Sequence, residues 1–229
     1  MFRIRIQNKK KCIWYCSAVV SFLLFLLLLG WTNHLANTQD AQQMAGRWSE
    51  KKDVAQISCF FSSKAEVTED TIQSFEYSLK NVLQEASITE TSENPSARLW
   101  VDAYSADGKI TLVNGKNTLD ANAIGIGGDF FMFHPLKLIT GSYFSGNDLM
   151  QDYCIIDQDA AWQLFGSNDV VGMTVYIGNV PHIVTGVVQR PDSRMDKAAG
   201  LNSTVVYVSY ETLSAYGTNN GINHYEIVM

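Results

Sequence analysis

A long apolar run opens the chain, and shorter alternating or periodic segments fill the rest of it. Residues 13–29 contain no charged side chain. About 20 apolar residues at about 1.5 Å each match the roughly 30 Å hydrocarbon core of a bilayer. A single segment can cross that core only as a helix, because lipid offers no partner for backbone polar groups. The pattern predicts a transmembrane helix over residues 12–31.

The charges before this run indicate its orientation. Arg3, Arg5 and the lysines at 9–11 place five cations and no acid there. The positive-inside rule keeps such a tail cytoplasmic, so residues 1–11 are expected inside the cell membrane and the main domain outside. A cleaved secretory signal shares the basic start, but its apolar region is about 7–15 residues and ends at a small-x-small site. The segment after Leu29 has no such site, which favours an uncleaved anchor.

The first half of the outer region predicts a stalk followed by a β-α-β unit. Apolar residues at helical spacing predict a helical stalk over residues 32–50 that continues the membrane helix. Alternation predicts a strand at 54–61, and Thr68 followed by two acids predicts a helix start. A second strand is expected at 99–104, with a turn at Asp107-Gly108 that leads into 109–113.

The second half reads as short strands and helices. Glycines at 125–128 predict a tight loop that feeds a buried aromatic segment, because Pro135 excludes the long helix that a phosphate-binding loop would need. The remaining pattern predicts a strand at 153–157, a capped helix at 157–166, a β-hairpin at 173–188, a mobile loop at 190–202, a strand at 204–208, a helix at 210–216 and a strand from 225.

The charge balance excludes one class of partner. Five of the 17 lysines and arginines precede the span, so the rest of the chain has 12 cations against 23 acids. Such a domain repels polyphosphate, and a nucleic-acid partner is not expected. Cys59 and Cys154 could form a disulfide in an oxidising compartment, but each lies in a strand-like apolar run, which favours buried free thiols.

Candidate chemistry along the chain has structural explanations. The histidines at 34, 134, 182 and 224 share no metal-binding motif, and His134 is expected to be a packed loop residue. Ser142 reads as a turn residue, and the acid pairs at 69/70 and 157/159 read as helix starts. We therefore expect no catalytic residue, no cofactor, no metal site and no enzymatic activity.

One stretch resembles a known family. The strand from Tyr153 precedes Ala161-Trp162-x-Leu-Phe-Gly166, then a Val-Val-Gly-Met-x-Val turn and a hairpin that ends Val-Thr-Gly-Val-Val188. This order and spacing is similar to the MacB-like periplasmic core domain of ABC transporter permeases. Gly141-Ser-Tyr-Phe144 resembles the Gly-Arg-x-Phe loop of the family, with Ser142 in place of arginine.

The resemblance implies an α+β fold, in which an N-terminal transmembrane helix precedes an extracytoplasmic domain of two lobes. Residues 53–123 and 222–229 would form a Porter-like β-α-β lobe, and residues 124–220 an inserted, mostly-β Sabre-like lobe. The returning Porter-like strand would begin near the end of this chain, which predicts a truncated permease rather than a natural short protein.

The resemblance also implies a function. The chain would be a non-catalytic permease part that transmits the motion of a cytoplasmic ATP-binding subunit across the lipid bilayer, for export or extraction of a substrate. It would act as a homodimer or paired permease. The alternative is a single-pass anchored binding or scaffold protein without an ATPase partner, and an anchored extracellular enzyme is a third hypothesis.

Overall fold

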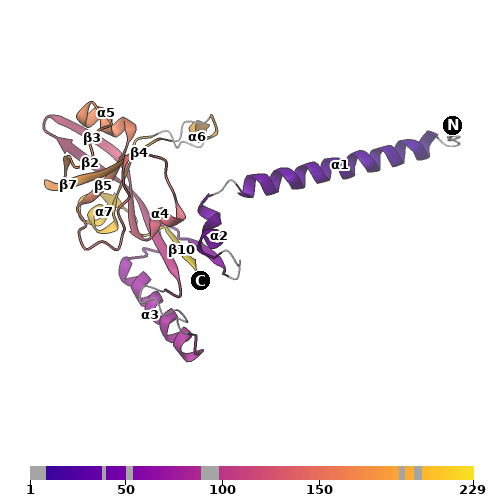
Figure 1. Ribbon diagram of the computed structural model, residues 1–229, viewed down its shortest axis with the longest axis horizontal. Helices are drawn as coiled ribbons and strands as arrows, with labels where there is room; N and C mark the ends of the chain where they lie inside the picture. Colours follow the sequence, from indigo (N-terminus) through magenta and orange to yellow (C-terminus); the bar gives the residue numbers. More distant parts are fainter. Residues whose placement is uncertain (1–8, 38–39, 50–53, 89–97, 191–193, 199–202) are drawn as a thin grey trace. The chain divides into compact units, whose positions relative to one another are not determined.

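The computed structural model describes residues 9–37, 40–49, 54–88, 98–190, 194–198 and 203–229. Two compact units divide the chain, residues 1–43 and residues 44–229. The first contains the α-helix α1 (Lys9–Asn37) and the 3-10 helix η1 (Asp40–Gln43). The second contains a mixed sheet with short helices (Figure 1).

The helix α1 has the length and composition of a membrane span. Residues Ile13–Leu35 form 23 apolar-rich positions, and none of this stretch is buried by other protein groups. At about 1.5 Å per residue the stretch is roughly 34 Å long, enough to cross the hydrocarbon core. The side chains of Phe22, Phe25 and Leu27 are exposed among the described residues, as expected of a helix whose apolar surroundings are lipid.

The predicted stalk over residues 32–50 is not one continuous α-helix. The α-helix ends at Asn37, residues 38–39 and 50 lie outside the described part, and Asp40–Gln43 is a 3-10 helix. A separate short α-helix, α2 (Met44–Trp48), follows. Asn and Asp compete with helical hydrogen bonds through their own side chains, which explains why helical spacing alone did not locate this break.

Among the described residues of the second unit, ten strands form one sheet. Its strand order is β1-β10-β2-β3-β8-β5-β7-β4, while β6 pairs with β2 and β7, and β9 pairs with β2. The strands are β1 (Gln56–Phe60), β2 (Val101–Asn114), β3 (Asn117–Gly128), β4 (Leu138–Gly141), β5 (Tyr153–Asp157), β6 (Thr174–Ile177), β7 (Val180–Val188), β8 (Val205–Ser209), β9 (Thr218–Asn219) and β10 (His224–Val228).

The β-α-β unit of the first half accommodates the last strand. Both β1 and β2 pair antiparallel with β10, which lies between them. The connecting helix α3 (Glu69–Glu85) begins after Thr68, as predicted. Tyr225 and Ile227 of β10 pack with Ile72 of α3, and Val228 packs on the opposite face with Met44 and Phe133. Successive side chains of a strand point to opposite faces of the sheet, so β10 contributes to the core under α3 on one face and to the core under α2 and α4 on the other.

The predicted turn at Asp107-Gly108 is wrong, because β2 continues through both residues. Gly108 pairs with Ala123 of β3 and with Asn219 of β9. A Cβ atom there would lie 2.3 Å from the carbonyl oxygen of Thr218, so this glycine permits close packing rather than a turn. The hairpin turns instead at Gly115, whose φ is +60°.

The glycine-rich segment at 125–128 is also a strand rather than the predicted loop. It forms the end of β3 and pairs with β2. A Cβ atom on Gly127 would lie 1.9 Å from the ring of Tyr104, and one on Gly125 would lie 2.7 Å from Leu213. These glycines leave room for bulky neighbours. The buried aromatic segment that follows is confirmed as α4 (Phe130–Phe133).

The remaining elements match their sequence signals. The helix α5 (Gln158–Phe165) has Asp157 as N-cap and Gly166 in the left-handed conformation after its end. The hairpin β6–β7 turns at Gly178-Asn179, where both φ values are positive, as a type I′ turn requires. Helix α7 (Tyr210–Tyr216) follows β8, and both α5 and α7 pack on the β2–β3 hairpin (Figure 1).

Two sequence expectations remain open. Within the predicted loop 190–202, residues 194–198 form the short helix α6 (Arg194–Ala198), and residues 191–193 and 199–202 lie outside the described part. The division into Porter-like and Sabre-like lobes stays a prediction. Its expected border at residue 124 falls inside β3, which pairs with β2 along its whole length.

Candidate functional site

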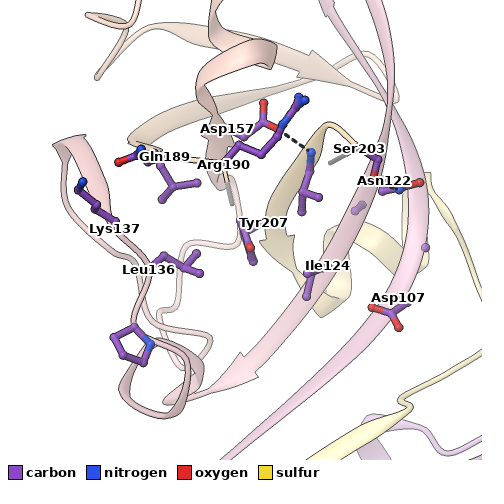
Figure 2. Close-up of a pocket in the computed structure, with 15 residues that line it drawn as sticks. Asp107, Asn122, Ile124, Leu136, Lys137, Asp157, Gln189, Arg190, Ser203 and Tyr207 are labelled. Atoms are coloured by element: carbon purple, nitrogen blue, oxygen red, sulfur yellow. Dashed lines mark hydrogen bonds and ion pairs between the residues drawn. The ribbon is translucent and has the colours of Figure 1, made fainter. Parts of the chain in front are cut away.

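A cavity of about 740 Å³ lies on the sheet face that carries α4. Ile124 of β3, Tyr207 of β8 and Leu136 line its apolar part. Polar groups stand around it, among them Asn122, Gln189 and Lys137 from three different segments. Figure 2 shows Tyr207, Ile124 and Leu136 around the middle, with Asp157 and Arg190 together at one side and Asp107 apart from them.

Asp157 lines this cavity and links three segments by hydrogen bonds. Its Oδ1 accepts a hydrogen bond from the backbone N–H of Ala160 at 2.7 Å, which caps α5. Its Oδ2 accepts from the N–H of Val205 and from Nε of Arg190, each at 3.1 Å. The side chain is 3% exposed. These three hydrogen bonds fix the buried carboxylate in place and join the start of α5 to β8 and Arg190, which agrees with the predicted capping role.

Arg190 completes the same network. Its Nη2 lies 3.1 Å from Asp157 and 2.7 Å from Asp159, and it donates to Oγ1 of Thr204 at 3.1 Å. The guanidinium thereby joins the end of β7, the start of α5 and the start of β8. Tyr207 nearby is partly buried, and desolvation of its hydroxyl raises its pKa to about 12. The cavity therefore has an apolar floor, bordered by charged side chains that hydrogen bonds hold in place.

A second cavity, of about 710 Å³, lies between α3 and the residues leading into β2. Glu76 and Asp102 face each other in it, and the hydroxyl of Tyr225 donates to Oδ2 of Asp102 at 3.1 Å. Desolvation, with a hydrogen bond to Asp102, raises the pKa of Glu76 to about 7. Desolvation also raises the pKa of Asp102. A hydrogen bond between two carboxyl groups requires a proton on one of them, and the raised pKa of Glu76 favours Glu76 as its site.

The third feature is a cluster that the sequence did not reveal. His134, His224 and Glu226 each direct one ligand-type atom to a common point, and the three atoms lie within 4.8 Å of one another. His134 was expected to be a packed loop residue, and its ring does stack on Phe130 with centroids 4.6 Å apart. The available signal was the i, i+2 spacing of His224 and Glu226, which places both on one face of a strand.

The other candidates lie apart from these sites. His182 is buried, with Nδ1 3.0 Å from the carbonyl of Val180 and Nε2 3.1 Å from Oγ1 of Thr212, and His34 is exposed on α1. Ser142 directly follows β4, and its backbone N–H donates to the carbonyl oxygen of Thr185 in β7 at 2.9 Å. Cys154 is fully buried and Cys59 partly buried, and both are free thiols, as favoured.

The fold defines a class: a mixed α/β sheet domain, preceded in sequence by a helix of membrane-spanning length. The sequence model of the MacB-like periplasmic core domain matches residues 20–228. The chain therefore belongs to the MacB-like periplasmic core domain family, and the resemblance found in the sequence is confirmed.

Similar proteins agree with this family. The "Macrolide export ATP-binding/permease protein MacB" of Chromobacterium violaceum is 32% identical over 99 residues, which cover 42% of this chain and 15% of that protein. The MacB of Pasteurella multocida is 30% identical over 98 residues, or 42% and 14% of the two chains. This chain thus aligns with only a small part of these relatives.

Two solved structures are also similar. The periplasmic region of MacB from Actinobacillus actinomycetemcomitans has a TM-score of 0.43 at 24% identity, and covers 58% of this chain and 59% of that one. The extracellular domain of the noncanonic ABC-type transporter YknZ from Gram-positive bacteria has a TM-score of 0.43 at 23% identity, with 56% and 63% coverage. The family assignment rests on the match of the family's sequence model to residues 20–228 and not on these structural similarities.

Proposed function

We propose that this chain supplies the first membrane helix and the extracytoplasmic domain of an ABC transporter permease subunit. The domain would transmit ATPase-driven motion across the membrane for export or extraction of a substrate. One observation carries the proposal: the family match runs from residue 20, inside the apolar helix, through the sheet domain to residue 228. The basic tail would lie in the cytoplasm and the sheet domain outside the membrane.

The contacts of α2 support a mechanical role. Met44 is 1% exposed and packs with Phe133 and Val228. Arg47 donates from Nη2 to the carbonyl oxygens of Met132 at 2.7 Å and Phe133 at 3.1 Å. These contacts fix α2 to α4 and β10, so a displacement of the preceding chain would move this part of the sheet domain as a packed body.

The partners follow from the family rather than from contacts in this chain. We propose a cytoplasmic ATP-binding subunit as the source of motion, the lipid bilayer as the environment of α1, and a homodimer or paired permease as the assembly. The permease part itself would be non-catalytic. The charged pair of Asp157 and Arg190 is already engaged in structural hydrogen bonds.

Affinity isolation of the full-length tagged chain from its native membranes tests the proposal. We expect an ABC-type ATP-binding subunit to co-purify, with ATP hydrolysis that depends on the presence of this chain. Arg47→Ala should reduce the coupled hydrolysis while leaving co-purification intact, because it loosens α2 from α4. Lys116→Ala, on the exposed β2–β3 turn, is the matched control.

Isolation of the chain without any ATP-binding subunit would contradict the transporter proposal and favour a single-pass anchored binding or scaffold protein. Equal coupled hydrolysis in the Arg47→Ala and wild-type proteins would contradict the mechanical role of α2 alone.

A further inference from the structure

We propose that His134, His224 and Glu226 form a binding site for a divalent transition metal, with zinc as the expected ion. This inference is independent of the transport proposal, because it rests on the side-chain geometry alone. The three potential ligand atoms, two imidazole nitrogens and one carboxylate oxygen, lie within 4.8 Å of one another. Two histidines and one glutamate form a known zinc ligand set that leaves a fourth position open.

The three ligand atoms are otherwise unused. Within the described residues, Nε2 of His134, Nε2 of His224 and Oε2 of Glu226 are buried polar atoms without a hydrogen bond of acceptable geometry. Nε2 of His134 does lie 2.5 Å from Oε2 of Glu226, an ion-pair distance. Buried polar atoms normally find partners, and an ion shared by all three would supply one to Nε2 of His224, whose contact with the Glu226 carboxylate is 3.8 Å long.

The spacing suits a metal after a small adjustment. Zinc bonds of about 2.0–2.1 Å in a tetrahedral site hold neighbouring ligand atoms about 3.3 Å apart. His134 and Glu226 would therefore separate slightly. Nε2 of His224 lies 3.8 Å from Oε1 of Glu226 and within 4.8 Å of the other two ligand atoms, so it would move closer to Oε2. Both histidine side chains are about one fifth exposed, at 22% and 19%, so the cluster lies close to the surface although its ligand atoms themselves are covered.

The surroundings hold the ligands in place. Oε1 of Glu226 accepts a hydrogen bond from Oγ of Ser58 at 2.8 Å, which leaves Oε2 for the ion. The ring of His224 stacks on Phe60, with centroids 4.5 Å apart and an angle of 13° between planes. His134 is fixed by its stacking on Phe130. Such outer contacts orient metal ligands and raise affinity.

A bound ion would join parts of the fold that are distant in sequence. His134 follows α4, whereas His224 and Glu226 belong to β10, and Ser58 belongs to β1. The metal would clamp the end of α4 to the strand between β1 and β2. The same α4 receives the contacts of Arg47, so the ion would stiffen the region beside α2.

Metal titration of the full-length chain in detergent tests this inference. Cobalt(II) should bind with one equivalent per chain and give the visible d–d absorption of a low-symmetry site. Added zinc should displace the bound cobalt and abolish this absorption. X-ray absorption of the zinc-loaded wild-type chain should show two imidazole nitrogens and one carboxylate oxygen. This measurement needs no variant, so it remains decisive if a substitution impairs folding.

His224→Ala and Glu226→Gln should each weaken zinc binding at least about tenfold, measured by competition with a chromophoric chelator. His34→Ala removes an exposed histidine far along the chain from the cluster and should bind like wild type. Unchanged affinity in His224→Ala, or a zinc environment without histidine nitrogen in the wild-type chain, would overturn the inference.

Discussion

The carboxyl pair in the second cavity makes the stability of the sheet domain depend on pH. Glu76 has its pKa raised from 4.5 to about 7, chiefly by desolvation. The folded state therefore binds this proton more tightly than the unfolded state does. The contribution of Glu76 to the free energy of unfolding is fully present below about pH 4.5, and it is lost as the pH rises through about 7.

The magnitude follows from the shift. At about 1.36 kcal/mol per pKa unit, the full change between pH 4.5 and pH 7 would be roughly 3 kcal/mol. Glu76 is only half-buried, so solvent screening reduces the expected effect to about 1–2 kcal/mol. Glu76→Gln removes the titration but keeps a donor toward Asp102. The variant should match wild type at pH 5 and be more stable by about 1–2 kcal/mol at pH 8.

Urea unfolding of the full-length chain in detergent, followed by circular dichroism at pH 5 and pH 8, measures this difference. Glu85→Gln, on the exposed end of the same helix, is the matched control and should show no such pH-dependent gain. The reasoning is refuted if Glu76→Gln is less stable than wild type at pH 8, or if its advantage is the same at both pH values.

Three further changes test other parts of the fold. Arg190→Ala should lower the free energy of unfolding by about 3 kcal/mol, because it leaves the buried carboxylate of Asp157 without its cation. This value is at the low end for a broken buried ion pair, since Arg190 is itself partly exposed, and urea unfolding measures it. Gly127→Ala should cost about 1–3 kcal/mol or more, since its Cβ would overlap the ring of Tyr104, and thermal unfolding should show a lower Tm, whereas an unchanged Tm would argue against this packing. Cys154, fully buried with its pKa raised to about 12 by desolvation, should resist alkylation until urea unfolds the chain; rapid alkylation of the native protein would place it elsewhere.

The elements predicted correctly are those specified by local chemistry. Asp157 and Gly166 mark the two ends of α5 by capping, and Gly178-Asn179 suits the positive φ angles of a two-residue hairpin turn. These signals depend on neighbours within a few residues. The start of α3 after Thr68 belongs to the same group.

The errors arose where distant residues decide the local structure. Gly108 and Gly127 resemble turn residues in the sequence, but each makes space for a neighbour from another element, Thr218 and Tyr104. Tertiary packing here overrides the usual meaning of glycine. The expected continuous stalk failed for another reason, because apolar spacing is too weak a signal near Asn37 to decide whether a helix continues.

The candidate sites were the least predictable part. His134 is about 90 positions before His224 in the sequence, and only the pairing of β10 between β1 and β2 brings them together. The Glu76–Asp102 pair likewise joins α3 to β2. A strand that returns to the first half from the end of the chain creates both neighbourhoods, and no local motif encodes that return.

Labelling of a single surface position in intact spheroplasts tests the central claim most directly. Leu149 is fully exposed in the sheet domain, so a Leu149→Cys variant presents a thiol to an impermeant maleimide, with the unmodified chain as background. An extracytoplasmic domain anchored by α1 predicts strong labelling of the variant before the membrane is opened. Labelling that occurs only after the cells are permeabilised would place the domain in the cytoplasm and contradict the account.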